Sequence, residues 1–335
     1  MSFQIVCKRV AAAAFAALIV FTVTAVAQKK TQATGTAPVD KATVIAPVGK
    51  SMRVAERNNL YCAGYVQTAP LDVKHRLMAG VEEADKFSYA GNDVVYLNAG
   101  GESGMKVGDM LTVVRPRGRV ETRWTQKNGG LGYYVQEIGA IEVIRVKRDV
   151  AVAKVKVSCD TFLLGDVLVP TESRTAPEYK QREALDLYGD PSGKALGRLF
   201  MARGNNDLIA QEFVVYIDLG QEDNVKPGDY LTIFRWLGDG NPVFGSWGES
   251  VSARDEGYQS DAYRGGKFSN QAARKKGEKA DGPVVTTGEA KEGRAEDLRK
   301  VVGEMVILNV KERTATALVT RNVGEIHPGD WVEVQ

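Results

Sequence analysis

The chain is poor in histidine and cysteine and has almost no surplus charge. Its 335 residues include two histidines and three cysteines, and 44 Lys and Arg stand against 42 Asp and Glu. This balance excludes a globally basic nucleic-acid-binding protein, because phosphate binding rests on a surplus of Lys and Arg. It also excludes an acidic, disordered chain. The sequence lacks G-x-S-x-G, H-E-x-x-H and P-loop motifs, which removes common signatures of hydrolases and nucleotide-binding enzymes.

The two surplus positive charges lie at the start of the chain. Lys8 and Arg9 precede an apolar stretch over residues 10–26, and Ala25-Val26-Ala27 has the small-x-small pattern of a signal peptidase site. We therefore expect residues 1–27 to be a secretory signal peptide and the mature chain to be periplasmic or extracellular. The alternative is an uncleaved anchor, since a membrane span needs ~20 residues; the membrane would then be contacted only through this leader. Residues 28–57 lack periodicity and are interpreted as a flexible tether.

Export determines how the cysteines are interpreted. Cys62 and Cys159 remain in the mature chain, and an oxidising compartment allows them to form one disulfide. Two unrelated buried thiols are the alternative. The disulfide would close a loop of about 100 residues and contribute about 4–5 kcal/mol in the chain-entropy model.

The most specific signal is an internal duplication. Val94–Arg115 (VVYLNAGGESGMKVGDMLTVVR) aligns without a gap to Val214–Arg235 (VVYIDLGQEDNVKPGDYLTIFR) at an offset of 120 residues, and half of the aligned residues are identical. A second block, Gly139–Val169, aligns to Gly303–Glu333 at an offset of 164. The chain is therefore a tandem duplication whose second copy carries 44 additional residues between its two blocks.

Each copy has the pattern of short strands. Val94–Leu97, Leu111–Arg115, Ala140–Val146 and Ala151–Val157 are rich in β-branched residues and are bounded by Gly, Asp and Lys. Five or six such strands in about 110 residues leave no room for crossover helices. We therefore expect an all-β protein with two tandem small β-barrel modules of the SH3 or OB type.

The repeats set the expected boundaries. The first module covers residues 58–171, a linker covers 172–193, and the second module covers 194–335. Leu71–Ala84 and Ala176–Tyr188 have weak helical patterns, and the second of them would make the linker a short helix. The additional segment, about 249–300, mixes dense charges with Gly and Ser, so we predict a disordered insertion there.

Gly-Asp pairs precede strands at four places. Two of the pairs follow Pro227 and Pro328, and Pro followed by Gly is typical of a type II turn. Metal binding by the four aspartates is the alternative, but four separate turns lack the clustered carboxylates of a calcium loop. We predict structural turns, and no metal site, at Gly108-Asp109, Gly165-Asp166, Gly228-Asp229 and Gly329-Asp330.

Candidate catalytic groups are few. His75 and His327 are the only histidines, and the acidic run Glu82-Glu83 with Asp85 has no partner at a comparable spacing. A Cys–His pair is conceivable, but a disulfide explains the cysteines of the mature chain better. We predict no catalytic residue, no cofactor and a non-enzymatic protein.

Aromatic residues between the two repeated blocks are the candidate ligand-binding residues. The first copy has Trp124, Tyr133 and Tyr134 there, and the second has Trp236, Phe244 and Trp247. Exposed rings on a β scaffold stack on sugars or anchor a protein partner. The alternative is that they close the barrel ends or cover the linker. Trp331, in the last strand, is expected in the core.

The repeated pattern resembles modules of bacterial envelope proteins. The block V-Y-L-N-x-G…G-x-K-x-G-D-x-L-x-V-x-R, followed by G-x-I-x-V-x-x-V and a closing G-D-x-L-V-P, is similar to the C-terminal domain of flagellar assembly protein T. It is also similar to the region that follows lysin-motif domains in some exported proteins. The resemblance covers Val94–Pro170 and Val214–Val334 and implies a flagellar or peptidoglycan-associated role. Its motifs mark turns and strands, so it transfers no site residue, and neither a lysin motif nor a flagellar N-terminal domain is recognisable in the sequence.

Three hypotheses of function follow. The leading one is an exported, non-enzymatic envelope protein that binds or scaffolds at the cell wall or an envelope-spanning assembly, with envelope proteins or peptidoglycan as partners. The second is a protein-interaction scaffold that uses strand edges or the charged insertion. The third is an envelope hydrolase, which needs a pocket where a histidine meets a carboxylate or a nucleophile. Nucleic acid is not an expected partner, and the oligomeric state stays open.

Overall fold

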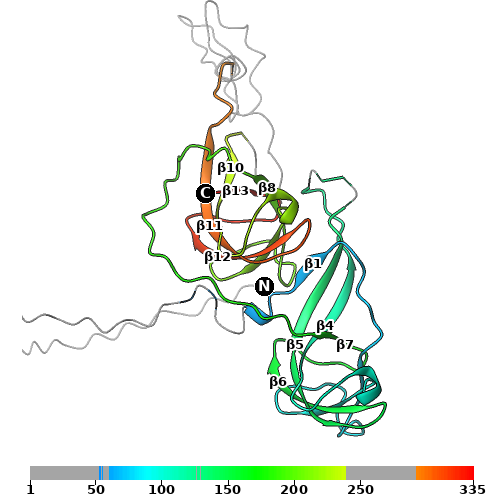
Figure 1. Cartoon of the computed structure of the whole chain (residues 1–335). Helices are drawn as coiled ribbons and strands as arrows, with labels where there is room; N and C mark the ends of the chain where they lie inside the picture. The colour runs from blue at the N-terminus through cyan, green and yellow to red at the C-terminus, as the bar shows by residue number, and fades with distance from the viewer. Residues whose placement is uncertain (1–52, 54, 56–59, 126, 129, 239–291) are drawn as a thin grey trace, which may run out of the picture. The chain divides into compact units, whose positions relative to one another are not determined.

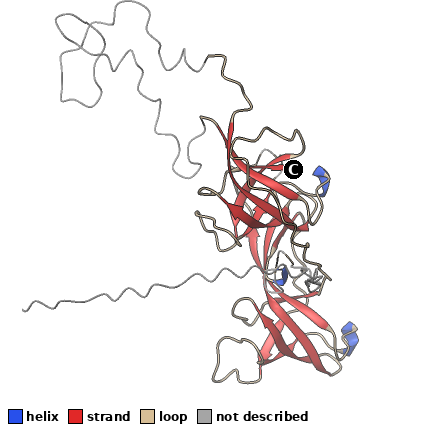
Figure 2. Cartoon of the chain, turned by 90° about the vertical axis from the view of Figure 1, so that its left-hand side faces the viewer, coloured by secondary structure: helices blue, strands red, loops and turns tan. Residues whose placement is uncertain are grey.

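The described part of the chain is all-β, as expected. A computed structural model describes residues 53, 55, 60–125, 127–128, 130–238 and 292–335 (Figure 1). The chain divides into two units, Met1–Val48 and Gly49–Gln335, and every described residue belongs to the second. Both repeats of this unit consist mainly of strands, with short 3-10 helices η1 (Gly101–Ser103) and η2 (Gln221–Asp223) at equivalent positions (Figure 2).

The first repeat forms a seven-stranded antiparallel sheet. Its strand order is β2-β3-β6-β5-β4-β7, and β1 pairs with the beginning of β5 outside this path. The two ends of the sheet meet through one bridge between Arg76 and Val167 and through backbone hydrogen bonds such as Leu77 N–H to Asp166 O (2.8 Å). The strands are β1 (Tyr65–Gln67), β2 (Leu77–Gly80), β3 (Val94–Leu97), β4 (Met110–Arg119), β5 (Tyr133–Val146), β6 (Ala151–Ser158) and β7 (Val167–Pro170).

The second repeat forms a closed six-stranded barrel. Its order, β10-β11-β12-β9-β8-β13, places each strand where its counterpart lies in the first repeat. Pairing of β13 with β8 closes the barrel, with Trp331 opposite Arg198. The strands are β8 (Leu196–Ala202), β9 (Val214–Ile217), β10 (Tyr230–Trp236), β11 (Arg299–Val310), β12 (Ala315–Asn322) and β13 (Trp331–Val334).

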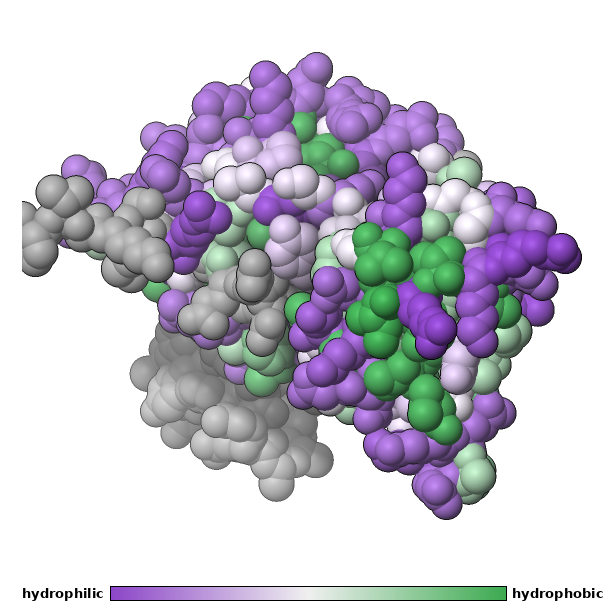
Figure 3. All heavy atoms as spheres, turned by 60° about the horizontal axis from the view of Figure 1, so that its bottom comes forward, coloured by the Kyte–Doolittle hydropathy of each residue, from purple (hydrophilic) through white to green (hydrophobic). Residues whose placement is uncertain are grey.

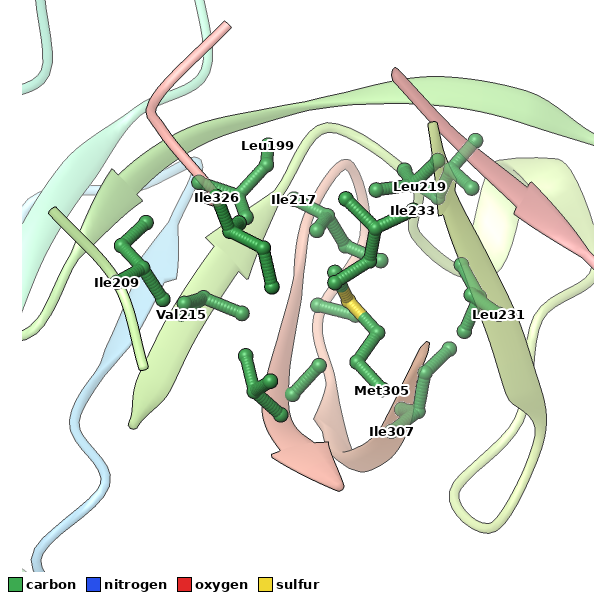
Figure 4. Packing of buried hydrophobic residues seen from close by; sticks show 14 of the residues in the cluster. Leu199, Ile209, Val215, Ile217, Leu219, Leu231, Ile233, Met305, Ile307 and Ile326 are labelled. Atoms are coloured by element: carbon green, nitrogen blue, oxygen red, sulfur yellow. The ribbon is translucent and has the colours of Figure 1, made fainter. Parts of the chain in front are cut away.

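Alternating side chains give each barrel its interior. In β5, Ile141 and Val143 are fully buried while Glu142 between them is half-buried, which is the period of two of a strand with one covered face. In the second barrel, aliphatic side chains from all six strands converge on one core (Figure 4). Each fully buried aliphatic side chain stabilises the fold by about 1.5–3 kcal/mol.

Both predicted helices are wrong. Leu71–Ala84 contains β2 instead, because its backbone hydrogen bonds go across to neighbouring strands: Gly165 N–H donates to Leu77 O (2.9 Å) and Val81 N–H to Val94 O (3.1 Å). Ala176–Tyr188 is extended chain and turns. It packs along the second barrel, where Val301 N–H donates to Leu187 O (2.9 Å). Tertiary hydrogen bonds therefore override the weak helical patterns.

Several predictions fall on residues that the structure does not describe. The predicted leader lies outside the described residues, as does most of the tether. The predicted insertion also lies mainly outside them, but its last two residues, Arg299 and Lys300, already belong to β11. Arg299 is buried and forms an ion pair with Glu333, so its charge is part of the barrel rather than of a solvated segment.

The surface is largely hydrophilic, with apolar residues gathered in one patch on the face that Figure 3 shows. Exposed large apolar side chains include Phe87, which is 94% exposed. Within the described ranges, no helix has the length and apolar character needed to cross a membrane.

Candidate functional site at the junction of the two repeats

The four Gly-Asp pairs share one turn geometry. The glycines have φ between +91° and +102°, a region that disfavours residues with a side chain. In each turn one carboxylate oxygen of the aspartate accepts the backbone N–H of the residue three positions earlier at 2.8 Å, for example Lys106 N–H to Asp109 Oδ2 and Lys226 N–H to Asp229 Oδ2. These carboxylates are therefore occupied in holding their own turns.

Two of these aspartates also hold an arginine on a neighbouring strand. Asp166 accepts two hydrogen bonds from Arg115, from Nε at 2.7 Å and from Nη2 at 2.8 Å, and Asp330 is held by Arg235 in the same way. In both repeats Nη2 also donates to a backbone carbonyl, that of Thr161 or its counterpart Glu325. Hydrogen bonding to Asp166 raises the pKa of Arg115 above its ordinary value. We name these pairs the clamps; sequence reasoning missed them, although the repeat alignment contains both arginines and both aspartates.

The predicted disulfide is present. Cys62 and Cys159 are bonded and separated by 97 residues, with their Cα atoms 5.5 Å apart. Cys62 belongs to a segment, residues 60–67, that ends in β1 and that we name the strap. The bond attaches the strap to the residues that follow β6, and β1 pairs with β5 of the same repeat.

The strap also binds the second barrel through its backbone carbonyls. Thr316 and Thr314 donate to Gly64 O (3.0 Å) and Val66 O (2.8 Å), and Tyr216 Oη donates to Ala63 O (2.7 Å). Gly64 has φ +68°, and a Cβ there would lie 3.0 Å from the Tyr216 hydroxyl oxygen. Only glycine permits this close approach without strain.

The burial of β9 shows where the two repeats contact each other, a region that we name the junction. All four residues of β9 are buried, whereas its counterpart β3 alternates between half-buried and buried residues. A strand covered on both faces loses the period of two. The covering cluster joins Leu60, Ala63 and Val66 of the strap to Tyr216 and Leu318 of the second barrel. The two repeats are therefore packed against each other through the strap.

A buried carboxylate holds the strap in place. Glu137 is 3% exposed; its Oε2 accepts the backbone N–H of Gly64 (3.0 Å), and its Oε1 is 2.7 Å from Nη2 of Arg174. Arg174 Nη1 in turn donates to Leu60 O (3.2 Å). Burial lowers the pKa of Arg174, but the neighbouring carboxylates outweigh it, so the net pKa lies above the ordinary value. The pair thus fixes both the start and the middle of the strap.

The candidate aromatic residues of the first repeat lie at this junction. Tyr134 is half-buried, its ring packs edge-on against Tyr216 with centroids 5.2 Å apart, and its hydroxyl lies 3.1 Å from the Tyr216 hydroxyl. Trp124 packs against the covering cluster, with the Arg123 guanidinium 4.3 Å from its ring centroid. Tyr133 is half-buried in β5. The structure brings Tyr134 and Trp124 to the junction, and their binding of a ligand stays a prediction.

The candidate residues of the second repeat lie elsewhere. Trp236 is half-buried at the end of β10, edge-on to Phe234 with centroids 4.9 Å apart. Phe244 and Trp247 lie outside the described residues. Trp331 is half-buried rather than in the core, because its ring lies under the guanidinium of Arg198, 3.6 Å from the centroid.

The histidines lie in different repeats. The His327 ring is 2.6 Å from Asp207 O through Nδ1 and 3.4 Å from Glu325 Oε2 through Nε2. His75 Nδ1 is buried without a hydrogen-bond partner in the described part. In the same part of the chain, no group of three or more His, Cys, Asp or Glu side chains is placed to hold a metal ion. The non-enzymatic interpretation stays a prediction.

A cleft of about 530 Å³ opens beside the disulfide. Residues of the first repeat that line it include both cysteines, Arg117, Tyr134 and Gln136, and those of the second repeat run from Met201 to Asn205. Its volume lies in the range of small-molecule sites, which often form where two domains meet. The cleft is therefore the candidate functional site, and of the predicted aromatic residues it contains Tyr134.

No protein-family model matches the chain, and no curated protein is significantly similar to it in sequence.

Proposed function

We propose that the chain is an exported, non-enzymatic envelope protein in which two tandem β modules act together as a binding or scaffolding unit at the cell wall or an envelope-spanning assembly. The disulfide between Cys62 and Cys159 is the observation that carries this proposal. Disulfides persist in oxidising compartments, which fits the secretory pattern of residues 1–27. The bond lies within the first repeat and fastens the strap, whose carbonyls bind the second barrel.

The packing of the two repeats supports the scaffolding part of the proposal. A flexible pair of domains would be joined by an exposed linker with few contacts. Here the carbonyls of the strap accept hydrogen bonds from side chains of the second barrel, and the strap shares a buried cluster with it. Two repeats fixed in this way bind a partner at a lower entropic cost than two independent modules.

Co-sedimentation with purified peptidoglycan tests the glycan-binding form of the proposal. We expect the mature wild-type chain to be retained and Trp124→Ala and Trp236→Ala to reduce retention, because stacking on an aromatic ring is a common mode of sugar binding. Tyr188→Phe, at a ring that is 80% exposed, is the matched control. Circular dichroism establishes that each variant is folded. Negligible retention of every sample would refute wall binding, and crosslinking in the envelope would then seek a protein partner.

A further inference from the structure

Two arginines from different repeats line the cleft beside the disulfide. Arg117 lies in β4 of the first repeat, and Arg203 follows β8 of the second; both side chains are exposed. Arg117 Nε donates to Gln136 Oε1 (2.6 Å), and Arg203 Nη1 donates to Cys62 O (3.2 Å). A guanidinium has five N–H donors, so one hydrogen bond orients each group and leaves most of its donors available.

Neither arginine forms an ion pair with a carboxylate of the described residues. Of the two carboxylates that line the cleft, Glu137 is already bound to Arg174 and to the backbone of Gly64. The other, Asp160, accepts hydrogen bonds from Gln136 Nε2 (2.8 Å) and from the N–H of Thr161 (2.7 Å). Arg117 and Arg203 are therefore not neutralised by a direct ion pair, and Asp160, which accepts these hydrogen bonds from neutral groups, places one negative charge on the same lining.

Both arginines act electrostatically on Tyr134, which lines the same cleft. Burial raises the pKa of the Tyr134 hydroxyl, while the charges of Arg203 and Arg117 act on the same hydroxyl in the opposite direction. Each guanidinium therefore contributes positive potential at this half-buried ring, while burial keeps the net pKa of the hydroxyl above its ordinary value. A region with this potential favours an anion.

The duplication distinguishes these arginines from structural ones. The clamp arginines, Arg115 and Arg235, occur at the same position of both repeats. The counterpart of Arg117 is Leu237 and that of Arg203 is Val81, whose backbone N–H donates to Val94 O as that of Arg203 donates to Val214 O, so neither arginine is required to build the module. Their presence at the junction alone indicates a role that only the joined repeats have.

We propose that the junction cleft binds the carboxylate of a small organic ligand through Arg117 and Arg203. Guanidinium groups match carboxylates in geometry and charge. The Tyr134 ring, Met201 and the disulfide provide apolar surface for the remainder of the ligand. A sugar acid and a peptide C-terminus both offer this chemistry. The inference does not rest on the proposed function, because it concerns the ligand of the cleft wherever the protein acts.

Two matched pairs of probes test this site by calorimetry and ligand-observed NMR. One pair is glucuronate and glucose; the other is N-acetyl-dialanine and its C-terminal amide. We expect at least one carboxylate to bind about tenfold or more tightly than its neutral partner, since hydrogen bonds between a guanidinium and a carboxylate are stronger than those between neutral groups. The pair that responds identifies the source of the carboxylate. Binding should weaken between low and high salt, because both arginines are exposed to solvent.

Variants of the mature chain assign the binding to the cleft. Arg117→Gln and Arg203→Gln keep a polar side chain and remove the charge, and each should lower carboxylate affinity about tenfold. Arg145→Gln is the matched control, since this exposed arginine of β5 has no side-chain hydrogen bond or ion pair within the described ranges. Three outcomes would overturn the proposal. The acid and neutral probes could bind equally, or no probe could bind at 10 mM, which is roughly the weak limit of specific sites. The third is an equal loss of carboxylate affinity in the Arg145→Gln control. Peptidoglycan retention can fail while the probes still bind, so the two proposals are tested separately.

Discussion

The clamps allow one repeat to be tested against the other. Arg235→Ala removes the bidentate partner of Asp330, whose side chain is fully buried. Breaking a buried ion pair by removing one partner destabilises a protein by about 3–5 kcal/mol, because the remaining charge is left uncompensated. The Arg235 side chain is 19% exposed, so water reaches one side of the clamp. We therefore expect a loss of about 3 kcal/mol in the free energy of unfolding of the second barrel, at the lower end of that range.

A double-mutant cycle separates the contribution of the Arg235–Asp330 ion pair to stability from the contribution of the turn that Asp330 holds. Asp330→Asn removes the charge and keeps an oxygen to accept the N–H of His327. The double variant with Arg235→Ala should be less destabilised than the sum of the single variants, by a coupling free energy of about 1–3 kcal/mol. The same cycle with Arg115→Ala and Asp166→Asn should give a similar coupling in the first repeat, where the two side chains are 17% and 3% exposed.

Urea unfolding measures these effects. Fluorescence of Trp236 and Trp331 reports on the second barrel, and hydrogen exchange of β4 and β7 amides reports on the first. Arg145→Ala, at an exposed arginine that forms no ion pair within the described residues, should change stability by less than about 0.5 kcal/mol. If the single effects add within about 0.5 kcal/mol in both repeats, the clamps are not coupled pairs and the reasoning is wrong.

Two further predictions concern the strap. Replacing both Cys62 and Cys159 by serine should lower the free energy of unfolding by about 4–5 kcal/mol in the chain-entropy model, since the bond closes a loop of 97 residues. Urea unfolding midpoints with and without reductant measure this loss. A change below about 1 kcal/mol would contradict the prediction. Burial raises the pKa of Tyr65 from 10.0 to about 12, so the neutral ring contributes stability that is complete below pH 10 and is lost as pH rises toward 12. Tyr65→Phe should flatten this loss in urea titrations from pH 9 to 11.5, whereas Tyr188→Phe should leave it unchanged.

The sequence was sufficient to predict the barrels because their determinants are local and occur twice. Strand periodicity predicts β3 and β6 to within one residue, although it missed β2, and positive φ at the glycines of the four Gly-Asp pairs follows from turn chemistry. Equivalent hairpin corners follow Val146 and Val310: Lys147 N–H donates to Val150 O (2.8 Å), and Lys311 N–H donates to Thr314 O in the second repeat (2.8 Å). The clamps could also have been predicted from the sequence, since an identical arginine and an identical aspartate recur together in both copies.

The junction could not be predicted from the same information. Tyr96 and Tyr216 are identical residues at equivalent positions, yet Tyr96 is half-buried and Tyr216 is fully buried, because the strap covers Tyr216. The threonines that bind the strap, Thr314 and Thr316, correspond to Val150 and Val152 in the first repeat. Their role depends on a partner segment about 250 residues away. The periodicity of apolar residues indicates which face of a strand is apolar, but it does not indicate which segment covers the other face.

Divergence between the two copies is thus the most informative feature of the chain. Where the copies agree, as at the clamps and the Gly-Asp turns, the shared residues build the barrel. Where they differ at the junction, the differing residues either bind the strap or line the cleft. The strap contributes to both, because the carbonyl of Cys62 orients Arg203 while the disulfide at the same residue attaches the strap to the first repeat. The cleft exists only when the two copies are joined, so a duplicated structural module has acquired a candidate site that neither copy contains alone.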